Sequence, residues 1–230
     1  MSEMELTVLM PCLNESESIA FCIEEVKEYI RRAGIHAEIL IADNGSTDRS
    51  REIAARCGAR VVTVLQKGYG NALIGGIRAS QGRYIIMGDC DGSYDFSNLD
   101  LLLQKLREGY SLVVGNRYLG GIEKGAMPFL HRYVGVPVLS LLGRWRYRVK
   151  VGDFHCGLRG FDRKKALTLG LSCSGMEFAT ELIGRFAGAG EPVCEVPTVL
   201  RRDRRSGPSH LRTFSDGFRH LWFILLAAKN

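Results

Sequence analysis

The chain has 230 residues, of which 46% are hydrophobic and 24% are charged, and its formal net charge is +6. This length suits one large domain or two small ones, and the composition excludes a disordered or fibrous protein. The seven cysteines are scattered and form no Cys-x-x-Cys pair. Their pattern argues against a disulfide framework or a zinc site and favours reduced thiols in a cytosolic setting.

The charge is unevenly distributed, because arginine and lysine are concentrated at 144–150 and 201–212. Such an asymmetry indicates an anionic partner: nucleic acid, phosphate groups or an anionic membrane surface. The opening residues have neither a basic flank nor a long apolar run, so we expect no signal peptide. No stretch approaches the roughly 18 apolar residues of a membrane-spanning helix.

The first half of the chain alternates between strand and helix patterns. Residues rich in β-formers predict strands at 6–10, 38–42, 60–65, 83–88 and 111–115. Between them, apolar residues recur at helical spacing, as in Ile19, Ile23, Val26 and Ile30. The alternation predicts an α/β fold in which helices cover a mostly parallel central sheet.

The second half is less regular. It predicts a loop at 120–128, a helix near 176–187 and an edge strand at 193–200, where Pro197 interrupts the ladder. A closing amphipathic helix is expected to carry Phe214, Phe218, Leu221, Trp222 and Leu225. Basic and apolar residues alternate over 144–150, which predicts an edge strand with its cations on one face, or a contact with anionic lipid headgroups.

Two acidic strand ends carry the strongest chemical signal. The strand at 83–88 runs into Asp89-Cys90-Asp91, and the strand at 38–42 runs into Asp43. Because ligands bind at the carboxyl ends of parallel strands, both ends should face one crevice. Two carboxylates one residue apart suit Mg²⁺ or Mn²⁺, with a diphosphate completing the coordination.

A dinucleotide-binding site is a competing interpretation. Gly68 and Gly70 follow a strand, and Asp89 lies 19 residues after Gly70. However, Leu73 stands at the third glycine position of that fingerprint, and the interpretation leaves Asp43 and Asp91 without a role. The sequence therefore favours a metal and diphosphate site.

Seven short motifs then occur in order along the chain, at 8–15, 43–48, 67–72, 89–91, 115–117, 152–159 and 205–209. They include Pro-x-x-Asn-Glu at 11–15, Asp-Asn-Gly-Ser-Thr-Asp at 43–48, Gly-Asn-Arg at 115–117 and Arg-Ser-Gly-Pro-Ser at 205–209. In this order and spacing, the chain resembles the inverting family-2 glycosyltransferases, which have a Rossmann-like GT-A fold. Among these it most resembles the enzymes that make polyprenyl-phosphate sugars.

The resemblance implies roles for individual residues. Asp91 and Asp89 would be the metal ligands and, with Arg117, the catalytic residues. The nucleotide-sugar site would comprise Pro11, Asn14, Glu15, Asp43, Lys67, Gly70 and Asp89. The acceptor phosphate would be held by Arg117, Arg132, Arg205 and Ser209. Ser93 stands where dolichyl-phosphate mannose synthases have Gln, so the resemblance leaves the sugar open.

The type of acceptor decides whether a catalytic base is needed. A sugar hydroxyl must lose a proton during attack, whereas a phosphate monoester, with a second pKa of about 6, is already deprotonated at neutral pH. A phosphate instead needs positioning by planar guanidinium groups, which are abundant in the second half. The arginines therefore favour a phosphate acceptor over a saccharide hydroxyl.

We therefore expect a single glycosyltransferase domain over 1–230, with a nucleotide-sugar and metal half at 1–115 and an acceptor half at 116–230. It would transfer a sugar from a UDP- or GDP-linked donor to a polyprenyl phosphate, with Mg²⁺ or Mn²⁺, at the cytoplasmic face of a membrane. An alternative within the same enzyme family is transfer of the sugar to a saccharide hydroxyl instead of a phosphate. A nucleic-acid-binding α/β domain is supported only by the basic second half and has no recognised motif, so no nucleic-acid partner is expected.

Overall fold

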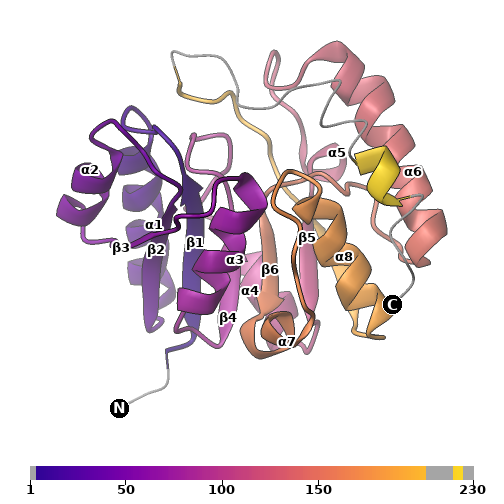
Figure 1. Cartoon of the computed structure of the whole chain (residues 1–230), viewed down its shortest axis with the longest axis horizontal. Coiled ribbons are helices and arrows are strands. Elements are labelled where there is room, and N and C mark those ends of the chain that lie inside the picture. The colour runs from indigo at the N-terminus through magenta and orange to yellow at the C-terminus, as the bar shows by residue number, and fades with distance from the viewer. Residues whose placement is uncertain (1–3, 206–219, 225–230) are drawn as a thin grey trace.

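A seven-stranded sheet forms the centre of the molecule (Figure 1). The computed structural model describes residues 4–205 and 220–224. The strands are β1 (Leu6–Cys12), β2 (Ala37–Asp43), β3 (Arg60–Thr63), β4 (Tyr84–Met87), β5 (Leu112–Asn116), β6 (Arg159–Asp162) and β7 (Val193–Pro197). Their order in the sheet is β3-β2-β1-β4-β6-β5-β7. Only β6 runs antiparallel to its neighbours β4 and β5, which confirms the predicted mostly parallel sheet.

Helices cover the sheet, as expected for parallel strands joined by crossovers. They are α1 (Ile19–Ala33), α2 (Ser50–Arg56), α3 (Tyr69–Ala79), α4 (Asp100–Arg107), α5 (Arg117–Gly120), the π-helix η1 (His131–Gly135), α6 (Val136–Tyr147), α7 (Arg163–Thr168) and α8 (Phe178–Gly188). In the view of Figure 1, α3 and α8 lie in front of the sheet and α4 lies behind it. All seven residues of β1 are buried, which makes β1 a central strand of the core.

The predicted strands of the first half are confirmed to within a few residues, and β7 is the edge strand that Pro197 indicated. Strand β6 was not predicted. It has only four residues, two of them charged, and its Arg159 is fully buried. The guanidinium of Arg159 donates hydrogen bonds to the backbone carbonyls of Cys156, Phe154 and Ala179. These hydrogen bonds stabilise the buried charge of Arg159. The hydrophobic periodicity of the sequence does not predict a buried arginine at this position.

The strand prediction for 144–150 is wrong, because α6 runs to Tyr147. Basic and apolar residues alternate over these seven positions, which suggested the two-residue period of a strand. The longer spacing of Leu130, Val134, Val138 and Leu141 has the helical period, and it governs the structure. Within 4–205 and 220–224, no helix has both the length and the apolar character needed to cross a membrane.

Part of the C-terminal prediction lies outside the described residues. Ser209 is among them, as are Phe214, Phe218 and Leu225 of the expected amphipathic helix. Residues 220–224, which are described, are helical.

Candidate active site

The predicted motifs follow strands whose carboxyl ends share one edge of the sheet. Strands β1 and β4 pair in parallel at the point where the strand order changes direction. Such a switch point leaves a crevice between the loops that follow the two strands. Here the loop after β1 contains Asn14 and Glu15, and the loop after β4 contains Asp89 and Asp91. The candidate site is therefore built across the β1 and β4 ends.

Asp89 is held in place by a neighbouring aromatic side chain. The hydroxyl of Tyr69, at the start of α3, donates a hydrogen bond of 2.9 Å to Asp89 Oδ1. Burial raises the pKa of Tyr69 well above its usual value, so it remains a neutral donor. Burial and then the nearby charge of Asp91 raise the pKa of Asp89 to about 6. A Cβ on Gly157 would lie 2.6 Å from Asp89 Oδ2, so glycine leaves the room that this carboxylate occupies.

The two carboxylate oxygens of Asp91 have different partners. Its Oδ1 accepts a hydrogen bond of 2.9 Å from the backbone N–H of Ser93. Its Oδ2 lies 3.0 Å from Nη2 of Arg205. Asp91 is 8% exposed, so its charge is largely removed from water and needs a positive partner.

The donor set fits a divalent cation. Mg²⁺ is commonly held by one or two carboxylates together with substrate phosphates. Asp89 and Asp91 are two carboxylates close enough for the charge of Asp91 to raise the pKa of Asp89, and the Arg205 guanidinium contacts Asp91. Among the described residues, no group of three or more His, Cys, Asp or Glu is arranged to hold a metal ion. The protein thus offers a partial set of oxygen ligands, which a bound diphosphate would complete.

The turn after β1 and the loop after β2 form one hydrogen-bonded unit. Asn14 has a φ of 58°, and its Oδ1 accepts hydrogen bonds from the backbone N–H groups of Thr47 and Asp48, at 2.8 and 3.3 Å. The Glu15 N–H donates to Ser50 Oγ at 2.8 Å. Burial raises the pKa of Glu15 to about 7, against the opposing effect of the Arg205 guanidinium. The observed contacts of Asn14 therefore join two loops.

Asp43 and Pro11 also have structural partners. Asp43 is fully buried, and its carboxylate accepts hydrogen bonds from the backbone N–H groups of Gly45 and Ser46. The carbonyl of Pro11 accepts a hydrogen bond of 3.1 Å from Cys90 Sγ, which ties β1 to the loop after β4. Asp43 thus shapes the loop at 43–48, and its contact with a nucleotide base stays a prediction.

Lys67 and Gly70 are positioned by close backbone packing. Lys67 Nζ donates to the Asn44 carbonyl at 2.9 Å. A Cβ on Gly70 would lie only 2.0 Å from the Cys173 carbonyl oxygen, and the Gly70 N–H donates to the Ser174 carbonyl at 2.9 Å. The glycine is therefore required where α3 meets the segment before α8. A role for either residue in binding the nucleotide-sugar stays a prediction.

Arg117 is bound within the protein. Its Nε and Nη2 donate to Asp153 Oδ2 and Oδ1 at 2.7 and 2.8 Å, and both side chains are buried. The sequence motif at 152–159 includes Asp153 but gave it no role, and the structure shows that its carboxylate binds two nitrogens of the Arg117 guanidinium. The observed geometry therefore gives Arg117 a positioning role, while its predicted catalytic and phosphate contacts remain untested.

The other predicted acceptor residues lie on two different segments. Arg132 belongs to η1, and its carbonyl accepts a hydrogen bond of 2.8 Å from the hydroxyl of Tyr118, the neighbour of Arg117. Arg205 lies beside Asp91 and Glu15, directly at the predicted metal site. The structure thus brings Arg205 together with the metal ligands and places Arg132 on a separate helix.

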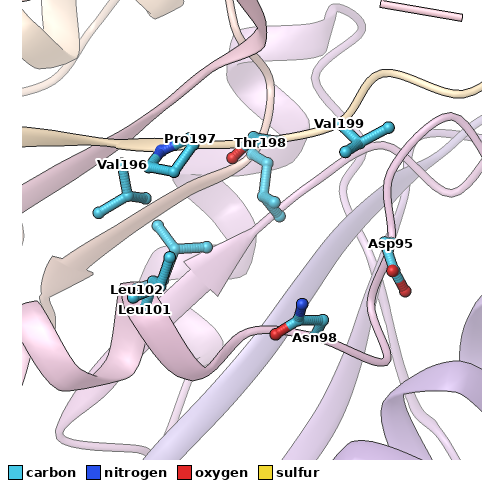
Figure 2. A pocket seen from close by; sticks show the side chains of 9 residues that line it. Asp95, Asn98, Leu101, Leu102, Val196, Pro197, Thr198 and Val199 are labelled. Atoms are coloured by element: carbon cyan, nitrogen blue, oxygen red, sulfur yellow. The ribbon is translucent and has the colours of Figure 1, made fainter. Parts of the chain in front are cut away.

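A small pocket contains none of the predicted site residues. Figure 2 shows its lining, which comes from α4, the loop before α4, Leu158 and the segment from the end of β7 to Val199. Its volume is about 100 Å³. Ligand pockets usually measure roughly 300–1,000 Å³. The pocket is therefore too small for a nucleotide-sugar.

Comparisons with known proteins identify the family of this chain. The model of the family described as "Glycosyl transferase family 2" matches residues 7–170. The low-salt glycan biosynthesis hexosyltransferase Agl6 of Haloferax volcanii is 41% identical over 97% of this chain and 54% of its own length. The dolichyl-phosphate hexose transferase of the same organism is 30% identical over 93% of this chain and 89% of its own.

A solved structure shows the same fold. Glucosyl-3-phosphoglycerate synthase from Mycobacterium tuberculosis, in complex with Mn²⁺, UDP and glucosyl-3-phosphoglycerate, superposes with a TM-score of 0.75 at 23% identity. The match covers 97% of this chain and 79% of that one.

The chain belongs to glycosyl transferase family 2 and has the GT-A fold, so the predicted glycosyltransferase class is confirmed. It spans about half the length of the Agl6 hexosyltransferase, the curated relative with 41% identity.

The buried pair of Arg117 and Asp153 gives a testable prediction for stability. Replacing Arg117 with Met leaves Asp153 as an uncompensated buried charge, which should lower the free energy of unfolding by about 3–5 kcal/mol. The double variant R117M/D153L removes both charges and should recover most of that loss. Urea denaturation followed by circular dichroism measures both. An equal loss in the two variants would contradict a desolvated ion pair.

Proposed function

We propose that this protein transfers a hexose, with inversion, from a UDP- or GDP-linked sugar to a polyprenyl phosphate at the cytoplasmic face of a membrane. Asp91 and Asp89 would hold the divalent cation that assists the transfer. The observation that carries the lipid acceptor is an exposed apolar surface on η1 and α6, bordered by cations. The dolichyl-phosphate hexose transferase relative supports the same acceptor class.

The surface, called here the η1–α6 face, is formed by Leu130, Val134, Val138, Leu141 and Trp145. All five side chains are exposed, and Trp145 is 75% exposed. Leu130 directly precedes η1, and the spacing of the five residues places them along one side of the helical segment that runs continuously from 129 to 147. Contiguous apolar surface of this kind marks an interaction site, and a helix with one apolar face suits the plane of a lipid interface.

The charge around this face matches an anionic lipid surface. Residues 124–152 contain no Asp or Glu, and their six Lys and Arg residues are Lys124, Arg132, Arg144, Arg146, Arg148 and Lys150. Basic residues beside a membrane gain about 1 kcal/mol each from anionic lipids. In this proposal, the lipid surface also accounts for the cations that suggested a nucleic-acid-binding domain.

The neighbourhood of Arg117 favours an acceptor that needs no base. Asp153 is a buried carboxylate within the predicted acceptor half, but both of its oxygens accept hydrogen bonds from Arg117. A carboxylate held this way is poorly suited to take a proton from a sugar hydroxyl. A phosphate monoester avoids that requirement, because it is deprotonated before it attacks.

The roles of the chain's own residues follow from their positions. When bound, the cation would stabilise the negative charge that develops on the leaving diphosphate. Tyr69 would orient Asp89, and the Ser93 N–H would orient Asp91. Arg132 and Arg205 would position the acceptor phosphate, with Arg205 nearest the two carboxylates.

The metal ligands can be tested directly. Asp91→Asn keeps the size of the side chain but removes its charge, so sugar transfer should be abolished while the fold is retained. Asp95→Asn is the matched control, because Asp95 pairs with Arg201 at 2.7 Å in the same region. Excess EDTA should inactivate the wild type, and Mn²⁺ should restore it. Full activity in EDTA would contradict metal dependence.

The acceptor can be tested with a matched pair of molecules. Incubation with radiolabelled nucleotide-sugars should label farnesyl phosphate and leave farnesol and oligosaccharides unlabelled, because only the phosphate is nucleophilic without a base. Thin-layer chromatography separates the products. Transfer to a hydroxyl acceptor and none to the phosphate would replace this proposal with the saccharide-acceptor alternative.

Membrane contact can be tested through the η1–α6 face. The double variant L141E/W145E should bind vesicles of mixed neutral and anionic phospholipid at least about tenfold more weakly, since burial of one such side chain contributes about 1.5–3 kcal/mol. Leu65→Glu is the control, because Leu65 is an exposed apolar residue outside this face. Vesicle flotation measures binding. Equal flotation of both variants and the wild type would rule out this face.

A further inference from the structure

Arg205 contacts three carboxylates from separate segments. Its Nη2 lies 3.0 Å from Asp91 Oδ2 and 2.9 Å from Asp203 Oδ2, and its Nη1 lies 3.3 Å from Glu15 Oε1. The Arg205 side chain is 14% exposed. Glu15 follows β1 and Asp91 follows β4, so the guanidinium bridges the two loops of the candidate site.

The backbone beside Arg205 is fixed to the same loop as Asp91. The Arg204 N–H donates to the Asp91 carbonyl at 2.8 Å, and the Arg201 N–H donates to the Ser93 carbonyl at 2.9 Å. The Arg204 guanidinium lies 3.9 Å from the centre of the Phe21 ring. Residues 201–205 thus lie along the loop after β4, and the position of Arg205 is built into this packing.

The guanidinium contacts an oxygen that a metal ion would use. Asp91 Oδ1 accepts a hydrogen bond from the Ser93 N–H, which leaves Oδ2 as the less engaged oxygen apart from its contact with Arg205. Like charges at such short range repel each other, and a divalent ion repels the guanidinium twice as strongly as a monovalent one would. A divalent cation and the Arg205 guanidinium therefore compete for one oxygen.

We propose that Arg205 is the internal counter-ion of the metal-free site, and that binding of the metal and nucleotide displaces it toward the anionic acceptor. This inference rests on the proposed function. Arg205 Nε is buried and has no hydrogen-bond partner within the described part of the chain, so the side chain retains a donor for a phosphate oxygen. The displaced guanidinium would add its charge to the acceptor subsite only after the donor has bound.

The proposal predicts positive coupling between the two substrates. Binding of the metal and nucleotide releases Arg205 from Asp91, and the released Arg205 then strengthens binding of the acceptor phosphate. By linkage, the acceptor must strengthen donor binding by the same factor. Couplings of this kind typically change affinity by about 5–150-fold.

The first experiment measures Mn²⁺ binding without nucleotide, by electron paramagnetic resonance of the free ion. R205Q should bind Mn²⁺ at least about tenfold more tightly than the wild type, because the competing cation is gone. R201Q is the matched control: Arg201 lies in the same segment but pairs with Glu25 and Asp95. It should change the affinity by less than about threefold. Unchanged or weaker binding in R205Q, or an equal gain in R201Q, would overturn the proposal.

The second experiment measures farnesyl phosphate binding by calorimetry, with and without Mn²⁺ and a nucleoside diphosphate. The wild type should bind the phosphate at least about fivefold more tightly when both are present. R205Q should lack that increase, and R201Q should keep it. The same increase in R205Q would overturn the displacement.

These experiments separate a failure of the proposed function from a failure of the role assigned to Arg205. If neither UDP nor GDP with Mn²⁺ binds to the wild type, the proposed function fails. If the metal and nucleotide bind and R205Q behaves like the wild type, only the role of Arg205 fails. Circular dichroism of R205Q confirms that the variant is folded, and R205K, which keeps the charge without the planar fork, should give an intermediate Mn²⁺ affinity.

Discussion

Two buried carboxylates at the carboxyl edge of the sheet, Asp153 and Asp91, each pair with an arginine, and the architecture of the site depends on these two pairs. Asp153 is neutralised by Arg117, and Asp91 by Arg205. The first pair lies wholly within the protein, where removing one partner would leave an unpaired charge. The second lies at the candidate site, where the proposed metal ion would take the place of Arg205. The first pair is thus structural, and the second is the one to which we assign a role in ligand binding.

A hydrogen bond connects the segment that carries Arg117 with the proposed membrane surface. Arg117 begins the short helix α5, and the hydroxyl of its neighbour Tyr118 donates to the Arg132 carbonyl in η1. Through this link, the η1–α6 face is attached to the strand end that carries the Arg117–Asp153 pair. A lipid phosphate held by the protein would therefore approach from the side where the exposed apolar residues lie.

Much of the fold could be predicted because its signals are local. The strands of the first half are apolar runs bounded by turn residues, and the βαβ alternation places their carboxyl ends at one edge. Strand β6 and helix α6 could not be predicted in this way. The first depends on hydrogen bonds from a buried Arg159 to distant carbonyls, and the second was obscured by a short alternation within a helical period.

By itself, the sequence determined the α/β class, the family and the position of Asp89 and Asp91 at a strand end, because ordered motifs and periodic patterns are properties of neighbouring residues. Only the tertiary structure decided which cation each carboxylate has. Asp153 lies 36 residues from Arg117, and Asp91 lies 114 residues from Arg205. The order of the strands and the packing of the loops determine such partners, and the spacing of residues along the sequence does not predict them. The physical reason is that a buried charge is stabilised by whichever opposite charge the fold brings within hydrogen-bond distance.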